Sequence, residues 1–258
     1  MRTALIGYTG FVGNNLKQQH NFTDLYNSKN FKDMCGQEYD LVVCAGVSAV
    51  KWQANKEPVK DLEGINALRD VLSTISAKKF ILISTIDVYP VTHDKDETFD
   101  CGSIENHAYG KHRLAFERFC ECNFDDNTII RLPGLFGDGL KKNVVYDFLN
   151  DNCLEMINEN SSFQYYYLKN LWADIQVAVK NNIRLLNLFT EPVKTQEIYK
   201  LFFPLKKIGQ EQVPEAHYDL HTKYASYWNN GGNYIYTKEQ VMLQLKEFIE
   251  SYQRLQGD

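Results

Sequence analysis

Long apolar runs are missing from the 258-residue sequence. A helix needs about 20 predominantly apolar residues to cross a bilayer, so we expect neither a membrane-spanning helix nor a membrane partner. The first expected strand starts at Thr3, which leaves no room for a signal peptide in front of it. The sequence therefore predicts a cytoplasmic location.

A basic excess is also missing, because 28 Lys and Arg residues stand against 33 Asp and Glu residues, for a net charge of -5. Binding to nucleic acid through bulk charge is therefore disfavoured. The six cysteines include no C-x-x-C pair, and Cys120 and Cys122 lack a second pair at metal-ligand spacing. His217 and His221 would share a helix face, but Pro214 and the loop-rich composition there argue against zinc. We expect reduced thiols and no metal.

Short apolar runs alternate with amphipathic stretches through the first half of the chain. The runs predict strands over residues 3–6, 22–26, 41–45, 80–83 and 128–132. The stretches between them predict helices over residues 11–19, 60–76 and 109–120. Continuous apolar strands separated by helices indicate a parallel sheet covered on both faces. The predicted fold is therefore α/β, with a doubly wound parallel sheet of the Rossmann type.

The second half is more irregular, and it carries no repeats or low-complexity linkers. It predicts helices over residues 144–149, 168–180, 195–203 and 237–252. A strand over residues 185–189 is expected to return to the same sheet. We predict a single unit over residues 1–258, in which 1–136 mainly bind a cofactor and 137–258 form a smaller, mainly substrate-binding part.

Three glycines, Gly7, Gly10 and Gly13, follow a predicted strand and open a predicted helix. This is the context that a dinucleotide-binding turn requires, with phosphate held by the N–H groups of the helix N-terminus. The first glycine permits the turn, the second admits the pyrophosphate, and the third lets helix and strand pack closely. The alternative is a turn without a ligand. The predicted cofactor contacts in this run are Gly7, Thr9, Gly10, Phe11, Val12 and Gly13.

The end of the second strand bears on the choice between NAD and NADP. An acidic residue there would bind the ribose hydroxyls of NAD, but Asp24 is expected inside the strand. The residues that follow, Asn27, Ser28 and Lys29, suit a 2′-phosphate through their donors and positive charge. We therefore predict NADP, with NAD still possible. Ala45 and Gly46, after the third strand, are expected either to approach the cofactor or to form a simple turn.

Tyr109 and Arg113 are predicted to share one face of a helix, because they are four residues apart. A tyrosine has a pKa of about 10, and a nearby cation favours its phenolate and lowers that pKa. Thr85 follows a predicted strand at the sheet edge where such folds bind ligands, so its hydroxyl can bond a substrate oxygen. A packed surface pair is the alternative for Tyr109 and Arg113. We predict that Thr85, Tyr109 and Arg113 are catalytic, with the last two also contacting the cofactor.

These residues resemble the extended short-chain dehydrogenase/reductase family, the group of nucleotide-sugar epimerases, dehydratases and reductases. The glycine run resembles its G-x-x-G-x-x-G pattern, and the segment 84–89 resembles S-[ST]-x-x-V-Y with Thr85 at the catalytic hydroxyl. The segment 109–117 resembles Y-G-x-S-K-x-x-x-E. The resemblance implies a nicotinamide cofactor, with Pro133 beside it, and a sugar substrate whose hydroxyl or keto carbon reacts. It also implies a homodimer as one assembly.

Arg113 stands where the family has lysine. The guanidinium of arginine is planar and donates in several directions of one plane, whereas the ammonium of lysine is a compact charge. The family's dehydratases carry an acidic pair after the catalytic threonine, whereas Ile86-Asp87 supplies one carboxylate. This departure favours ketone reduction or epimerisation over dehydration. The rival hypothesis is a cofactor-binding sensor or scaffold without turnover, which the Arg113 replacement favours.

Substrate-binding candidates come from several segments, and each also has a purely structural explanation. Asp87 follows the catalytic threonine, and His107 precedes the catalytic tyrosine. Lys142 and Asn143 lie in the region that the resemblance directs toward a nucleotide diphosphate. The complete predicted set is Asp87, His107, Lys142, Asn143, Gln164 and Tyr166.

Overall fold

The computed structural model describes residues 1–256, and its contacts divide the chain into two compact units. Unit 1 comprises residues 1–91, 98–132 and 169–187. Unit 2 comprises residues 92–97 and 133–168 and the described residues from 188 onward. The chain leaves unit 1 at Pro133, returns to it for one helix and one strand, and leaves it for the last time at Leu188. The sequence had instead predicted a functional boundary after residue 136.

Unit 1 is built on a six-stranded sheet in the order β2-β1-β3-β4-β5-β9, and every neighbouring pair is parallel. β1, β5 and most of β3 are buried along their length, since helices cover both faces. The predicted doubly wound parallel sheet is confirmed. Its strands are β1 (Thr3–Ile6), β2 (Asp24–Tyr26), β3 (Glu38–Cys44), β4 (Ser76–Thr85), β5 (Asn127–Leu132) and β9 (Leu185–Asn187).

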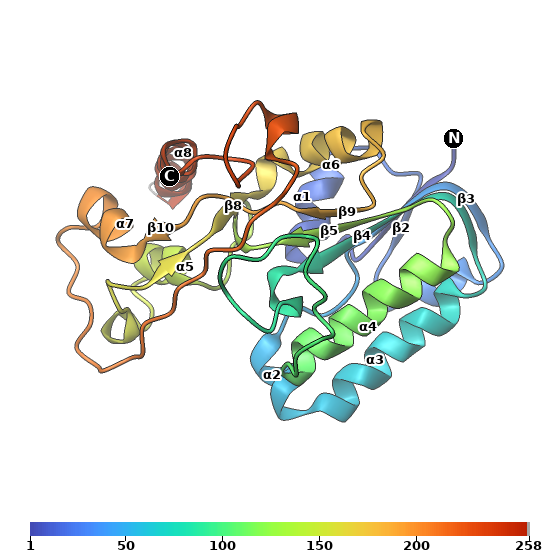
Figure 1. Cartoon of the computed structure of the whole chain (residues 1–258), viewed down its shortest axis with the longest axis horizontal. Helices are drawn as coiled ribbons and strands as arrows, with labels where there is room; N and C mark the ends of the chain where they lie inside the picture. Colours follow the sequence, from blue (N-terminus) through green and yellow to red (C-terminus); the bar gives the residue numbers. More distant parts are fainter. Residues whose placement is uncertain (257–258) are drawn as a thin grey trace. The chain divides into compact units, whose positions relative to one another are not determined.

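The helices of unit 1 lie on opposite faces of this sheet (Figure 1). On one face α1 (Phe11–Gln19) packs beside α6 (Leu171–Lys180). On the other face α3 (Pro58–Leu72) lies along α4 (Ala108–Asn123), and the short α2 (Lys51–Lys56) contacts both. Three short 3-10 helices connect these elements, namely η1 (Phe31–Met34), η2 (Ile86–Val88) and η4 (Leu168–Asn170).

The core of unit 1 lies between the sheet and the α3–α4 face. Val42, Phe80 and Leu72 are completely buried there, and the rings of Phe80 and Phe124 stack at 4.0 Å. Burial of apolar side chains contributes roughly 25 cal/mol per Å², so this layer holds α3 and α4 firmly on the strands. The position of α4 matters because it carries Tyr109 and Arg113.

Unit 2 has little regular sheet. β6 (Gly134–Phe136) pairs in parallel with β8 (Tyr165–Tyr167), and β7 (Ser162–Phe163) pairs antiparallel with β10 (Val193–Lys194). Aromatic stacking supplies much of its packing, as in the pairs Phe136–Tyr167 and Phe148–Phe203, each with ring centroids 4.8 Å apart. Its helices are α5 (Val144–Asn150), η3 (Leu154–Met156), α7 (Thr195–Phe202), η5 (Ala225–Trp228) and α8 (Lys238–Gln256).

The helix predicted over residues 60–76 is wrong at both ends. α3 begins at Pro58 and stops at Leu72. The hydroxyls of Ser73 and Thr74 donate to the carbonyls of Asp70 and Val71, and this local bonding competes with further helix. β4 then begins at Ser76 rather than Phe80, and the sequence analysis missed α2 entirely.

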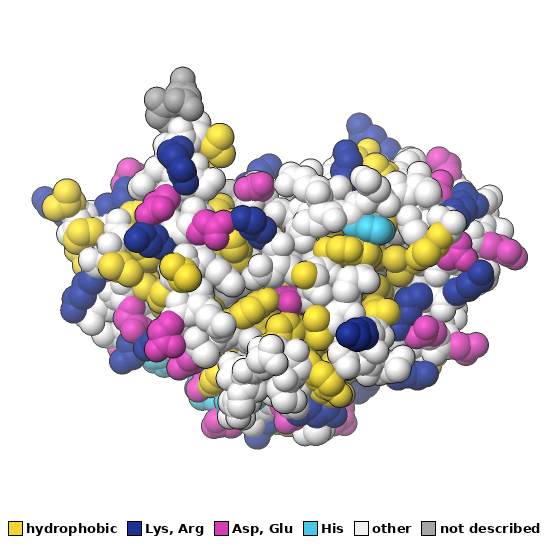
Figure 2. Space-filling model, turned by 90° about the horizontal axis from the view of Figure 1, so that it is seen from above, with side chains coloured by type: hydrophobic (Ala, Val, Ile, Leu, Met, Phe, Trp, Pro, Cys, Tyr) yellow, Lys and Arg dark blue, Asp and Glu magenta, His cyan; other side chains and the backbone are white. Residues whose placement is uncertain are grey.

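Basic and acidic side chains are interspersed on the face that Figure 2 displays, without a broad area of one sign. This distribution agrees with the near balance of 28 basic and 33 acidic residues. Within residues 1–256, no helix combines the length and the apolar character needed to cross a membrane.

Candidate active site

The glycine turn joins β1 to α1 at the carboxyl edge of the sheet. Gly7 has a φ of +87°, which favours glycine, and its N–H donates to the carbonyl of Tyr26 at 2.7 Å. A Cβ on Gly13 would lie 2.1 Å from the Gly7 carbonyl oxygen, so only glycine lets α1 start this close to the strand. Gly10 is the N-cap, and no side chain caps the helix. The turn therefore fits an anionic phosphate at the start of α1.

The end of β3 lies against this turn. A Cβ on Gly7 would come within 2.3 Å of the Ala45 carbonyl oxygen, and the Ala45 N–H donates to Ile6 at 2.9 Å. From β1 the sheet continues to β2 on one side and to β3 and β4 on the other. Ligands of doubly wound sheets bind at such a reversal of strand order. Ala45 and Gly46 therefore border the predicted cofactor crevice of unit 1.

The end of β2 carries no carboxylate. Asp24 belongs to β2 rather than following it, as predicted, although the strand starts at Asp24 and not at residue 22. It forms an ion pair with Arg2 at 2.9 Å. Asn27 follows the strand, and its side chain donates to the Tyr8 hydroxyl at 3.2 Å and accepts the Lys29 N–H at 2.9 Å. Ser28 and Lys29 are exposed beside it. The position after β2, where an NAD-specific enzyme would have an acidic residue, is thus occupied by Asn27, and Ser28 and Lys29 follow it.

Ser84 and Thr85 end β4 with side chains directed to different partners. The Ser84 hydroxyl donates to Glu117 at 2.5 Å. The Thr85 hydroxyl accepts the Asp87 N–H at 3.2 Å and lies 3.5 Å from the Asp87 carboxylate. Successive residues of a strand point to opposite faces, which explains why only Thr85 is directed toward Tyr109.

Tyr109 is the second residue of α4, and only 5% of it is exposed. The Thr85 side chain acts on its phenol and, against the larger effect of burial, lowers the pKa of Tyr109. Its backbone N–H donates to Asn55 of α2 at 3.0 Å. The Asn106 amide donates to the carbonyl of Asp87 at 3.0 Å, which ties the start of α4 to η2. The structure therefore brings together the two hydroxyls that the sequence analysis singled out.

Arg113 stacks on Tyr109, with its guanidinium carbon 3.9 Å from the ring centroid. The same guanidinium binds both carboxylate oxygens of Asp61, at 2.5 and 2.8 Å, and the Ser48 carbonyl at 2.7 Å. The ion-paired side chains are 5% and 7% exposed. Within residues 1–256 the Arg113 Nε has no hydrogen-bond partner. The cation is thus next to the tyrosine, but a buried carboxylate neutralises it.

The surroundings of Tyr109 act on its pKa in opposite directions. Burial raises the pKa, and it outweighs the lowering effect of the Arg113 charge; Asp87 adds a further increase. The contribution of Arg113 has the expected sign, but the net pKa is raised rather than lowered. Tyr109 is therefore a protonated phenol at neutral pH.

His107 and Asp87 have structural partners of their own. The Nδ1 of His107 accepts the Gly110 N–H at 3.0 Å, so this residue is the N-cap of α4. Burial lowers the pKa of His107, and the Lys51 charge lowers it further. The Asp87 carboxylate accepts a hydrogen bond from Lys51 at 2.5 Å. Lys51 is the first residue of α2, which the sequence analysis missed.

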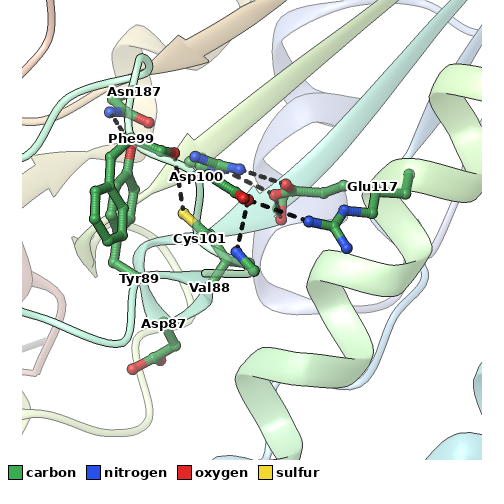
Figure 3. A network of polar contacts seen from close by, with 12 residues as sticks. Asp87, Val88, Tyr89, Phe99, Asp100, Cys101, Glu117 and Asn187 are labelled. Atoms are coloured by element: carbon green, nitrogen blue, oxygen red, sulfur yellow. Dashed lines mark hydrogen bonds and ion pairs between the residues drawn. The ribbon is translucent and has the colours of Figure 1, made fainter. Parts of the chain in front are cut away.

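A buried polar network holds α4 against the strands behind the site. Arg131 of β5 donates twice to Glu117 of α4, at 3.1 and 2.6 Å, and both side chains are less than 5% exposed. Arg131 also lies 5.0 Å from the ring centroid of Tyr89, whose hydroxyl accepts from Asn187 at 2.8 Å. Figure 3 shows Asp87 pointing away from this network. The Glu117–Arg131 pair therefore fixes the helix that carries Tyr109.

The remaining candidates lie in unit 2. Asn143 caps α5 by accepting the N–H groups of Val145 and Tyr146. Gln164 is buried and bonds only main chain, at Thr190 and Leu220. These hydrogen bonds give the side-chain amides of Asn143 and Gln164 a structural role. Tyr166 is completely buried, Lys142 is exposed, and Pro133 directly follows β5. These five residues belong to unit 2, whereas Thr85, Tyr109 and Arg113 belong to unit 1.

Sequence reasoning missed several residues that contact the predicted site residues, among them Lys51 (to Asp87), Asn55 (to Tyr109) and Asp61 (to Arg113). Lys51 and Asn55 lie in α2, and Asp61 lies in the first turn of α3. Asp61 had a readable signal, because an arginine in place of lysine at 113 calls for a planar acceptor. That this acceptor is Asp61, 52 residues away in the sequence, is known only from the tertiary packing.

Comparison with known proteins identifies the family of this chain. The sequence matches the model of the NAD dependent epimerase/dehydratase family over residues 13–160. No curated protein matches it by sequence. Because the family model covers more than half of the chain, membership follows from it independently of any structural likeness.

Several solved structures share the fold. They include UDP-glucose 4-epimerase from Thermotoga maritima with UDP-glucose (15% identity, 99% of each chain covered, TM-score 0.73). A dTDP-4-dehydrorhamnose reductase from Clostridium acetobutylicum has 15% identity, coverage of 98% of this chain and 100% of that one, and a TM-score of 0.71. MoeE5 with UDP-glucuronic acid and NAD has 13% identity, coverage of 98% and 99%, and a TM-score of 0.75. With its glycine turn, its parallel sheet and its paired threonine and tyrosine, the chain belongs to the NAD-dependent epimerase/dehydratase family.

Proposed function

We propose that this protein is an NADP-dependent reductase or epimerase that acts on a hydroxyl or keto carbon of a nucleotide-linked sugar. The observation that carries the proposal is the buried Tyr109 at the start of α4, with Arg113 stacked on its ring, on the same side as Thr85, which follows β4 at the sheet edge that also bears the glycine turn. Nucleotide sugars are bound by proteins of the same fold, including the UDP-glucose epimerase and MoeE5. That likeness supports the substrate class without naming the sugar.

The bound dinucleotide would supply or accept hydride. Tyr109, a phenol at neutral pH, would donate its proton to the carbonyl oxygen as that oxygen gains negative charge. Thr85 would donate a hydrogen bond to the same oxygen and hold it near the phenol. The unpartnered Nε–H of Arg113 is a donor suited to a ribose hydroxyl. Asp87 and His107 border the reacting group as substrate contacts, whereas Lys142 is proposed for the diphosphate.

The preference for NADP rests on the end of β2. A carboxylate there would repel a 2′-phosphate, but Asp24 is turned to Arg2, and Asn27 occupies the strand end. Lys29 and Ser28 can bind the phosphate through charge and hydrogen bonds. NADPH should therefore bind at least tenfold more tightly than NADH, and Lys29→Glu should remove most of that preference.

A cofactor-binding sensor without turnover is the second candidate, favoured by the neutralisation of Arg113 by Asp61. The enzyme and sensor hypotheses are distinguished by measuring NADPH absorbance in the presence of nucleotide sugars and 4-keto sugars, in wild type and in Tyr109→Phe. The enzyme hypothesis expects turnover that falls by roughly 10²–10⁴-fold in the variant, the usual contribution of a general acid. Tight NADPH binding with no turnover of any sugar would support the sensor, and undiminished turnover in Tyr109→Phe would overturn the catalytic assignment.

A further inference from the structure

Tyr8 is the one residue of the glycine turn, from Gly7 to Gly13, that the sequence analysis left without a role. The N–H groups of Gly7 and Tyr8 donate to the Tyr26 carbonyl at 2.7 and 3.4 Å, so the turn is tied to the end of β2. The Tyr8 hydroxyl lies at the same strand end, because it accepts a hydrogen bond from Asn27 Nδ2 at 3.2 Å. In dinucleotide-binding folds this strand end faces the adenosine ribose. The hydroxyl therefore lies on the side of the turn where a 2′-phosphate distinguishes NADP from NAD.

Asn27 is held in one orientation by its own loop. Its Oδ1 accepts the Lys29 N–H at 2.9 Å, a local turn typical of asparagine, and its backbone N–H donates to the Asn30 side chain at 2.7 Å. With the side-chain oxygen engaged in the loop, the amide nitrogen is directed to Tyr8. Asn27 is therefore a positioning residue for the phenol of Tyr8.

The Tyr8 hydroxyl has a proton to donate. A phenol donates one hydrogen bond, and the bond from Asn27 uses the oxygen only as an acceptor. Within residues 1–256 no group accepts the Tyr8 O–H. The side chain is half-buried, so the hydroxyl is fixed and still accessible. Hydrogen bonds to a charged acceptor are about twice as strong as neutral ones, and this donor therefore favours a phosphate oxygen over a ribose hydroxyl.

Lys17 of α1 supplies a positive charge beside the same ring. Its Nζ lies 5.5 Å from the centroid of the Tyr8 ring, within the distance at which a cation is attracted to an aromatic face. Lys17 is exposed, and it forms no ion pair with any residue that the structure describes. The carboxylate of β2, Asp24, is bound to Arg2 instead. A hydroxyl donor and a free ammonium thus lie together at the end of β2.

We propose that Tyr8 is the residue by which this protein distinguishes NADP from NAD: its hydroxyl, positioned by Asn27, donates to the 2′-phosphate, and Lys17 supplies a charge that attracts the phosphate. This inference rests on the proposed function and deepens it, because it assigns the cofactor preference to one donor within the glycine turn. It concerns binding alone and involves no step of the reaction.

The test measures binding without turnover, by isothermal titration calorimetry. NADPH and NADH are compared, and 2′,5′-ADP and 5′-AMP repeat the comparison without the nicotinamide. Tyr8→Phe keeps the ring and removes the donor, so it should weaken NADPH and 2′,5′-ADP by roughly fivefold and change NADH and 5′-AMP by less than about twofold. Tyr227→Phe, which removes an exposed phenol hydroxyl elsewhere, is the matched control and should leave all four Kd values unchanged.

Lys17 gives a second variant outside the turn. Lys17→Met should weaken NADPH by roughly threefold at low salt and by less at high salt, because exposed charges are screened. NADH should bind as it does to wild type, and Lys17→Arg should keep the wild-type values. Lys200→Met removes an exposed lysine of α7 and is the control for the loss of one charge.

The outcomes separate this inference from the proposed function. Equal weakening of NADPH and NADH in Tyr8→Phe, in protein with a wild-type melting curve, would assign Tyr8 to the shape of the turn and overturn its role in specificity. An unchanged NADPH Kd in Tyr8→Phe overturns that role as well, and either result leaves the proposed function standing while wild type prefers NADPH. A wild type that binds neither dinucleotide overturns both.

Discussion

Tyr109 has a raised pKa because it is buried, and that direction sets the pH dependence of the reaction. In reduction the protonated phenol is the active form, so kcat/KM should be level through neutral pH and fall as the pH rises above the ordinary tyrosine value of 10.0. In oxidation the phenolate is active, so kcat/KM should rise toward alkaline pH. The measurement is kcat/KM for both directions on one substrate pair. A reduction rate that already declines between about pH 7 and 8 would assign the proton to another group.

At the same scale, the partner of Arg113 explains how arginine can replace lysine. A guanidinium requires a planar acceptor when buried, and Asp61 provides both oxygens of its carboxylate. The compact ammonium of a lysine at this position would not match both carboxylate oxygens of Asp61 in the way that the guanidinium does. Arg113 and Asp61 therefore act as one buried pair, of which the motif at residues 109–117 contains only the arginine.

Two elements, α3 and α4, are joined by the Arg113–Asp61 pair, and His112 of α4 also lies 2.7 Å from Asp61. Breaking a buried ion pair by removing one charge costs about 3–5 kcal/mol. Asp61→Asn should therefore lower the free energy of unfolding by that order at neutral pH, as measured by urea denaturation. Asp70→Asn, an exposed change on the same helix, should have almost no effect.

The same pair predicts how stability depends on pH. Burial disfavours the Asp61 carboxylate, but hydrogen bonds from Arg113 and His112 outweigh it and hold the pKa of Asp61 below 3.8. A lowered folded-state pKa contributes stability above the ordinary value, and that stability is lost as the pH falls through the folded-state pKa. The difference between wild type and Asp61→Asn should accordingly shrink below pH 3.8. A difference that stays constant into acid would mean that the charge of Asp61 contributes nothing.

For the whole molecule, the glycine turn, Thr85 and Tyr109 all belong to unit 1. A ligand at 100 times its Kd stabilises the folded state by about 2.7 kcal/mol. NADPH should therefore raise the melting transition that includes unit 1, by roughly 5–10 °C for a protein of this size. This shift of the melting transition is measured by calorimetry with and without NADPH.

The matched variants for that experiment are two glycine substitutions in unit 1. Gly13→Ala places a Cβ 2.1 Å from a backbone oxygen and should abolish the response to NADPH, whereas a Cβ on Gly64 meets nothing within 4 Å and Gly64→Ala should keep it. A full NADPH response in Gly13→Ala would remove the glycine turn as the cofactor site.

Local pattern was sufficient for the sheet and for placing Thr85 at a strand end and Tyr109 at a helix start. Apolar runs bounded by turn residues predicted the strands of unit 1, and the spacing of Tyr109 and Arg113 predicted one helix face. The end of α3 was wrong, because the hydroxyls of Ser73 and Thr74 compete with the helix. Unit 2 was harder to predict, since its short strands pair across long loops and its aromatic residues pack rather than alternate.

The sequence by itself determined the order of strands and helices, the glycine turn and the identity of the threonine and tyrosine, because each of these depends on residues close together in the chain. Only the tertiary structure decided which charges meet at Tyr109. Asp61 of α3 reaches Arg113, and Lys51 of α2 reaches Asp87 beside Thr85. The pKa of a buried group depends on such neighbours and on the loss of water around it rather than on its own segment.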